Sequence, residues 1–145
     1  MTKTFSIVAV ACAVLLAGCA ARGGPSAAAA TGPTGLYTEA QAMRGTTLYS
    51  EQCASCHGED LTGIADLFPA LAGDAFLMLW QGRPMSELFE KVSLTMPALD
   101  PGSLTPEQSA DLVAYMLSVS KYPAGTTDLA SSADALGAIT IDAPQ

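Results

Sequence analysis

Two long stretches of this 145-residue chain carry apolar residues at helical spacing. The first begins at Thr38, which Gln41 follows three residues later in a capping-box pattern. Behind it, apolar or small residues recur at helical spacing up to a cysteine, namely Ala42, Gly45, Leu48 and Tyr49. Gly45 costs about 1 kcal/mol relative to Ala inside a helix, so we expect another helix to approach closely at this position.

The second stretch runs from about Thr105 to Ser120. Thr105 is placed to cap it, Pro106 suits the first turn, and Gln108 completes another capping box. Apolar residues follow around most of the circumference, which predicts a helix that is buried on more than one side.

Shorter apolar segments lie between these two helices. Residues 74–80 and 86–93 favour short helices separated by a Gly-Arg-Pro turn. No strand-like alternation occurs from 36 to 123, which predicts an all-α domain over these residues. Residues 124–145 are polar or Ala-rich, and we expect this C-terminal extension to be mobile or laid across the surface.

The N-terminal residues are typical of an export signal. Lys3 supplies a positive start, residues 5–16 are apolar, and small residues follow. The apolar run is too short to span a bilayer comfortably, which favours a cleaved signal over residues 1–18. Next comes a stretch rich in Ala, Gly, Pro, Ser and Thr, which predicts a flexible tether up to residue 35.

The end of the signal, Leu16-Ala17-Gly18-Cys19, resembles the lipobox of bacterial lipoproteins. The resemblance implies cleavage before Cys19 and lipid attachment there, so that residues 19–35 form a lipid-anchored tether. An ordinary signal with an unrelated cysteine near its cleavage site is the alternative. Because Ala20 stands where Asp would retain a lipoprotein at the inner membrane, the resemblance implies the periplasmic side of a bacterial membrane, with the outer membrane favoured.

The chain is acidic, with fourteen Asp and Glu against six Lys and Arg and a net charge of −8. Loss of Lys3 with the signal would make the mature chain one charge more negative. Nucleic acid is excluded as a partner, because phosphate binding needs the opposite sign. A redox partner with a basic docking surface fits this charge.

The cysteine count leaves one pair for chemistry. Of four cysteines, Cys12 leaves with the signal and Cys19 takes the lipid, so Cys53 and Cys56 remain. They lie in Cys-Ala-Ser-Cys-His, the C-x-x-C-H pattern of c-type haem attachment, which ends at His57. Two thiols one turn apart can each add to a vinyl group of one porphyrin, and the adjoining histidine is then placed beneath the iron. We therefore predict one covalent haem c, with His57 as its proximal ligand.

Other uses of this motif fit less well. A structural zinc site needs about four N or S ligands, whereas the mature domain offers Cys53, Cys56 and the single histidine. A thioredoxin-like site would need alternating strands and helices. A disulfide between the two cysteines would leave the adjoining His57 unexplained.

With these motifs, residues 36–123 resemble the class I monohaem cytochromes c. In that family the first helix ends in C-x-x-C-H and carries a glycine followed four residues later by an aromatic, as Gly45 and Tyr49 do here. It crosses a C-terminal helix, which residues 111–117 resemble. The resemblance implies the all-α cytochrome c fold, with N- and C-terminal helices crossing around one covalent haem.

The distal iron ligand is sought among the methionines, because His57 is the only histidine. Met96 precedes Pro97, which favours extended backbone on a restrained loop, and Thr-Met-Pro resembles the distal-ligand loop of the family. Met85, also on a loop, is the alternative. The remaining methionines of the domain are expected to fill the core, namely Met43, Met78 and Met116.

Three further haem contacts are implied by the resemblance. The carbonyl of Pro69, in Pro-Ala-Leu-Ala-Gly, would accept the Nδ1–H of the proximal histidine; otherwise Pro69 only punctuates a loop. Trp80 and Arg83 resemble residues around a buried haem propionate. Alternatively, Trp80 is a core residue and Arg83 a solvated charge.

An iron with His and Met on its two axial faces has no vacant position for a substrate, so we expect a one-electron carrier rather than an enzyme. Segments 82–93, 95–97, 101–104 and 122–125 also resemble proteobacterial cytochromes associated with quinoprotein (PQQ-type) alcohol dehydrogenases. That resemblance implies such an enzyme as electron donor, with a terminal oxidase or another cytochrome as acceptor. A fixed haem subunit of a dehydrogenase or oxidase complex and a gas-binding or sensing haem protein are the alternatives.

Replacing the predicted lipid-bearing residue tests the anchor. Cys19→Ser should release the protein into the soluble fraction, because the variant lacks the thiol that would carry the predicted lipid anchor. Membrane fractionation of expressing cells measures this. Cys12→Ser is the control, expected to stay membrane-bound. Continued membrane association of Cys19→Ser would contradict the anchor.

Overall fold

The computed structural model describes residues 35–144, so the predicted signal, Cys19 and the rest of the tether lie outside the described residues. Within this range the helices are, in chain order, α1 (Glu39–Gln52), α2 (Ala54–His57), α3 (Gly73–Trp80), α4 (Met85–Thr95), α5 (Pro106–Val119) and α6 (Ala133–Leu136). The same residues contain no strand and only two isolated bridges, which confirms the predicted all-α class. Among these helices, none has the length and apolar character needed to cross a membrane.

The two predicted capping boxes differ in the structure. At α5 both halves form, since the Thr105 hydroxyl accepts the Gln108 N–H at 3.2 Å and the Gln108 side chain accepts the Thr105 N–H at 2.8 Å. At α1 only one half forms, because Thr38 accepts the Gln41 N–H at 3.1 Å while the Gln41 side chain turns elsewhere. The prediction of a full box at Thr38 is therefore wrong, and the reason lies in the C-terminal extension described below.

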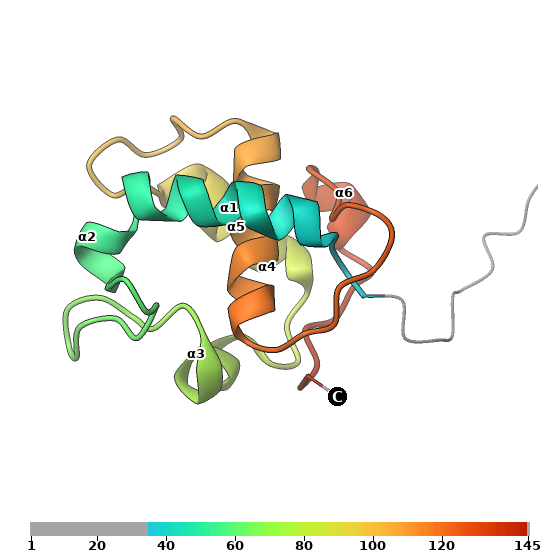
Figure 1. The fold of residues 1–145 in the computed structure, drawn as a ribbon, viewed down its shortest axis with the longest axis horizontal. Coiled ribbons are helices and arrows are strands. Elements are labelled where there is room, and N and C mark those ends of the chain that lie inside the picture. Colours follow the sequence, from blue (N-terminus) through green and yellow to red (C-terminus); the bar gives the residue numbers. More distant parts are fainter. Residues whose placement is uncertain (1–34, 145) are drawn as a thin grey trace, which may run out of the picture.

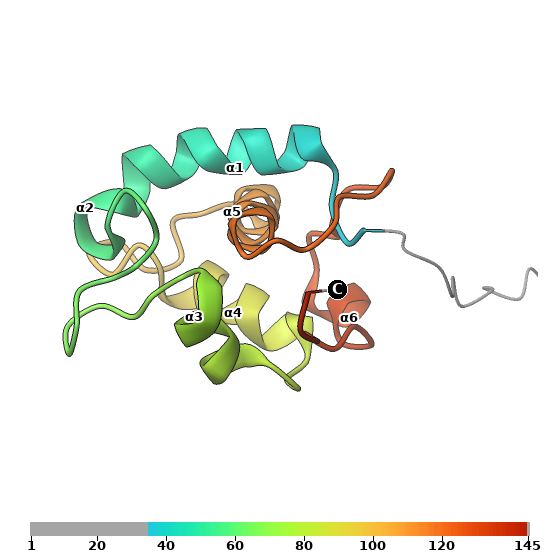
Figure 2. The ribbon, with the colours of Figure 1, turned by 60° about the horizontal axis from the view of Figure 1, so that its bottom comes forward.

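Helix α1 lies across α5, as Figure 1 shows, and Figure 2 shows α5 nearly end-on beneath α1. At the crossing, a β-carbon on Gly45 would lie 2.0 Å from the carbonyl oxygen of Asp111 and 2.8 Å from Cβ of Tyr115. Only a glycine permits this approach of the two backbones, which confirms the expected helix contact. One turn further on, the rings of Tyr49 and Tyr115 pack with centroids 5.3 Å apart.

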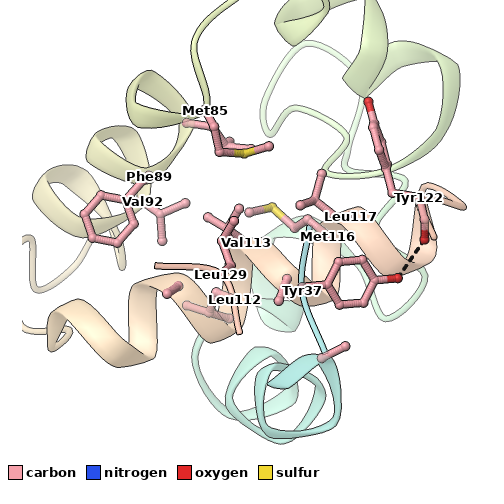
Figure 3. Packing of buried hydrophobic residues seen from close by; sticks show 14 of the residues in the cluster. Tyr37, Met85, Phe89, Val92, Leu112, Val113, Met116, Leu117, Tyr122 and Leu129 are labelled. Atoms are coloured by element: carbon pink, nitrogen blue, oxygen red, sulfur yellow. Dashed lines mark hydrogen bonds between the residues drawn. The ribbon is translucent and has the colours of Figure 1, made fainter. Parts of the chain in front are cut away.

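On its other side α5 packs against α4 (Figure 3). Met85 and Val92 of α4 lie against Val113 and Met116 of α5, and all four are buried. The predicted burial of α5 on more than one side is therefore confirmed, since α1 and α4 cover different faces of it.

The C-terminal extension contributes to the core, whereas the sequence predicted a segment that is mobile or laid across the surface. Its apolar side chains Leu129, Leu136 and Ile141 are buried, and α6 packs on α4. The three residues have no shared periodicity, because each fills a separate gap in the domain. The polar and Ala-rich composition around them concealed this role.

The first half of the extension is fixed to α1. The Gln41 amide donates to the Leu129 carbonyl at 3.1 Å and accepts the Leu129 N–H at 2.6 Å. Because this buried pair of hydrogen bonds occupies the Gln41 side chain, it does not cap α1. Next to it, Asp128 accepts from Thr38 and, at 2.9 Å, from Arg44. These bonds lower the pKa of Asp128, so the ionised carboxylate stabilises the docked extension above its unfolded pKa, and the contribution is lost as the pH falls through the lowered folded pKa.

A methyl group at the helix crossing tests the packing. Gly45→Ala should lower the free energy of unfolding by about 2 kcal/mol or more, because the clash outweighs the better helix propensity of Ala. Urea denaturation followed by circular dichroism measures this. Thr46→Ala, an exposed neighbour on the same helix, is the control and should be neutral or slightly stabilising. A Gly45→Ala protein as stable as the wild type would contradict the close crossing.

Candidate haem site

The C-x-x-C-H motif lies where α1 ends and the one-turn helix α2 begins (Figure 1). Cys53 is still tied to α1, because its N–H donates to the Tyr49 carbonyl at 2.9 Å. The N–H groups of Cys56 and His57 donate to the Cys53 carbonyl at 3.1 and 3.0 Å, which holds the motif in a single turn. The crossing of α1 over α5 therefore fixes where the two thiols and the imidazole lie.

The two cysteines are partly buried, and no disulfide joins them. Burial, and then the neighbouring Cys56, raises the pKa of Cys53 to about 11, so the Cys53 thiol is protonated at neutral pH. Across residues 35–144, no three His, Cys, Asp or Glu side chains gather as a metal site. The side chains of Cys53, Cys56 and His57 fit a porphyrin, which brings four nitrogen ligands of its own and takes the two sulfurs at its edge.

The imidazole of His57 is buried and oriented by one contact. Its Nδ1 lies 2.9 Å from the carbonyl oxygen of Pro69, the contact that the family resemblance implied. A carbonyl only accepts, so Nδ1 carries the proton and Nε2 keeps the lone pair that a metal needs. The ring also packs against Phe68, with centroids 5.9 Å apart.

A glycine that the sequence analysis did not single out holds this loop in place. Gly63 has φ +72°, and its N–H donates to the His57 carbonyl at 2.8 Å. A β-carbon there would lie 2.4 Å from the Phe68 carbonyl oxygen and 2.7 Å from the carbonyl carbon of Pro69. The backbone of Gly63 thus supports the peptide that accepts from His57. Nothing in the sequence around Gly63 indicates this, because the contact exists only once the loop folds back.

The five methionines of the domain differ in burial and in their positions on the helices. Met96 caps the C-terminus of α4 in extended backbone (φ −120°, ψ 151°) and is partly buried, as its place before proline predicted. Met85 was expected on a loop but is the first residue of α4, and it and Met116 lie in the core (Figure 3). Met43 and Met78 were expected in the core, but they are 71% and 81% exposed, because each points away from the packed face of its helix.

Trp80 is the last residue of α3, and Arg83 follows in the turn after it. The Arg83 guanidinium stacks over the Trp80 ring at 4.8 Å from its centroid and binds the carboxylate of Glu87 at 2.6 Å. The Arg83 side chain is thus paired but still 50% exposed, so the alternative of a solvated charge stays open. Trp80 is partly buried rather than a full core residue. Their role near a haem propionate stays a prediction.

Taken together, the fold and the site define a class of protein. Two long helices cross at a glycine, the first ends in C-x-x-C-H, and the histidine of this motif donates to a proline carbonyl. This is the all-α arrangement of the class I monohaem cytochromes c, with its N- and C-terminal helices crossing beside the haem motif.

Comparison with known proteins gives the family. The family described as "Cytochrome C oxidase, cbb3-type, subunit III" matches residues 40–116, and the chain belongs to this family. Cytochrome c-551 from Bacillus subtilis (strain 168) is 41% identical over 59 residues, which are 41% of this chain and 50% of that protein, so the chain spans about half the length of this relative. A solved structure, the sulfane dehydrogenase SoxCD from Paracoccus pantotrophus, matches with a TM-score of 0.44 at 22% identity, over 55% of this chain and 43% of that chain.

The chain therefore holds one covalent haem c at the Cys53–His57 motif.

Displacing the Pro69 carbonyl tests how this chain sets the basicity of its histidine. Gly63→Ala should push that carbonyl away from Nδ1 of His57, which makes the imidazole a weaker donor and the ferric state less stable. The reduction potential should rise by tens of millivolts, since a tenfold change in a one-electron equilibrium is about 59 mV.

Spectroelectrochemical titration of the haem-loaded protein measures this rise. Gly73→Ala is the matched control, because Gly73 also has φ +72° but a β-carbon there meets nothing within 4 Å. Equal potentials in Gly63→Ala and Gly73→Ala would show that Gly63 does not support the histidine contact.

Proposed function

We propose that this protein is a monohaem electron shuttle whose iron is held by His57 and Met96. In this proposal a lipid on Cys19 anchors it on the periplasmic side of a bacterial membrane, the outer membrane being favoured. Residues 19–35 act as the tether, and the haem domain passes single electrons between periplasmic or membrane redox partners.

The observation that carries the proposal is the state of His57. The side chain is 7% exposed, follows directly on the second cysteine, and has its Nδ1 bonded to a backbone carbonyl. A buried imidazole fixed in this tautomer presents Nε2 to a metal at no cost in reorientation. His57 is therefore the best-supported proximal ligand.

Met96 is supported as the distal ligand by comparison with the other methionines. A ligand thioether has to be held in place yet remain unengaged in packing. Met85 and Met116 are committed to the contact between α4 and α5, whereas Met43 and Met78 are largely exposed. Met96 alone among these five combines partial burial with a backbone position at the end of a helix, where extended geometry limits its freedom.

Such an iron suits electron transfer. With both axial positions taken by protein, there is no site for a substrate, and the same two ligands serve both oxidation states. Little reorganisation then opposes gain or loss of an electron, and the thioether favours the ferrous form. The haem supplies the redox change, while the protein supplies ligation, burial and orientation.

The net negative charge of the chain supports a redox partner with a basic docking surface. Fourteen carboxylates stand against six basic residues over the full sequence, and two of the basic side chains, Arg44 and Arg83, are paired with carboxylates. A donor or acceptor with a basic docking face would be steered toward such a surface. By resemblance we propose a quinoprotein alcohol dehydrogenase as donor and a terminal oxidase or another cytochrome as acceptor.

The matched family favours a second function, that of a fixed haem subunit. Its description names a subunit of a cbb3-type oxidase. A fixed subunit would carry electrons within one complex instead of moving between partners. Co-purification of a large partner in mild detergent would favour this function, and an uncomplexed anchored protein would favour the shuttle. A gas sensor is less well supported, because it needs an open distal position.

Removing the proposed distal thioether tests the ligand set. Met96→Ala, matured in the periplasm, should lose the iron–methionine charge-transfer band of the ferric spectrum and become able to bind external ligands, because one axial position opens. Optical spectra of the oxidised and reduced protein measure this. Met85→Leu is the control and should keep the wild-type spectrum, since Leu conserves the packing volume at a buried position. Unchanged spectra in Met96→Ala would remove Met96 from this role.

A further inference from the structure

The C-terminal extension pairs with the turn that leads into α4. The N–H of Ile141 donates to the Arg83 carbonyl at 2.9 Å, and the N–H of Gly82 donates to the Ile141 carbonyl at 2.8 Å. The N–H of Met85 donates to the Ile139 carbonyl at 2.8 Å. Because Ile141 is also fully buried, this turn is fixed by backbone bonds on both sides and by packing.

We name residues 133–141, which comprise α6 and this paired segment, the C-terminal clamp. The clamp replaces a missing helix cap. Pro84 is the N-cap residue of α4 and makes no side-chain cap bond, although the first N–H groups of a helix have no partner within it. The Ile139 carbonyl satisfies the N–H of Met85, the first helical residue. Beside it, α6 packs on α4 with Leu136 fully buried.

Helix α4 connects this clamp to the proposed distal ligand. The N–H of Met96 donates to the Val92 carbonyl at 3.1 Å, so the backbone of Met96 moves with the last turn of the helix. With eleven residues, α4 is roughly 16 Å long and transmits displacement as one rigid element. It is supported by α5 along its apolar face and by the clamp at its start (Figure 2). A shift at Met85 is therefore carried to Met96.

We infer that the C-terminal clamp positions α4 so that Met96 stays on the iron, and that the extension thereby sets how readily an external ligand displaces this methionine. The inference rests on the proposed function, in which Met96 is the distal ligand. Leu136 and Ile141 are positioning residues, which act on the iron through α4.

Imidazole titration of the oxidised, haem-loaded protein measures this property. Imidazole binds only while Met96 is displaced, so its apparent affinity follows the displaced fraction. A chain that ends after Ala138 lacks the paired segment, and we expect it to bind imidazole roughly tenfold more tightly than the full chain. Ile141→Ala, which keeps the backbone pairing but loses packing, should show a smaller gain. Ile141→Val should remain near the wild-type affinity, because it keeps a branched side chain at the buried site.

Two controls separate the clamp from general loss of stability. Ala42→Gly weakens α1, which packs on α5 away from the clamp, by about 1 kcal/mol and should leave imidazole affinity unchanged. In a Met96→Ala background, truncation after Ala138 should cause no further gain, because no methionine remains to be displaced.

The outcomes distinguish the two proposals. If Met96→Ala binds imidazole no better than the wild type, the proposed ligand is wrong and the clamp inference fails with it. If Met96→Ala gains affinity while the folded truncated chain and Ile141→Ala do not, only the clamp inference is overturned. An equal gain in Ala42→Gly would overturn it too, since general destabilisation would then displace Met96. Where the truncated chain does not fold, Ile141→Ala decides.

Discussion

The backbones of α1 and α5 meet at Gly45, where a single added carbon would lie inside the contact distance of the Asp111 carbonyl. This approach fixes the direction of α1 relative to the rest of the domain. Because Cys53 continues the hydrogen bonding of α1 and α2 follows within one turn, the same contact fixes the thiols and the imidazole. The place where a haem can be attached is thus decided by the packing of two helices, one of which carries none of the attachment residues.

From this crossing the structure extends in two directions. At one end of α1, the loop after the motif folds back so that a proline carbonyl reaches the buried histidine, and Gly63 supports that peptide. At the other end, the extension binds α1 through Gln41 and continues to α4 (Figures 1 and 2). The proposed proximal and distal sides of the iron are therefore held by separate segments.

The C-terminal extension enlarges the hydrophobic core of a small domain, although its sequence is mostly polar or Ala-rich. A domain of roughly 90 residues buries a limited share of its surface, so a few added apolar side chains matter. Leu129, Leu136 and Ile141 supply these side chains. Backbone and amide hydrogen bonds hold the polar stretches between them in place. The Gln41 amide contributes more here than in a cap, because it satisfies both backbone groups of Leu129 in a buried place.

The sequence by itself determined the four longer helices, the motif and the class of protein, because periodicity, caps and the C-x-x-C-H spacing are local properties. It also indicated the crossing, since Gly45 inside a helix has a cost that only a close neighbour explains. The tertiary structure decided what depends on residues distant along the chain. Met85 entered the core, Met43 and Met78 remained exposed, and the extension docked on α1 and α4. Single apolar residues without a repeating pattern reveal their burial only when the surfaces that receive them have formed.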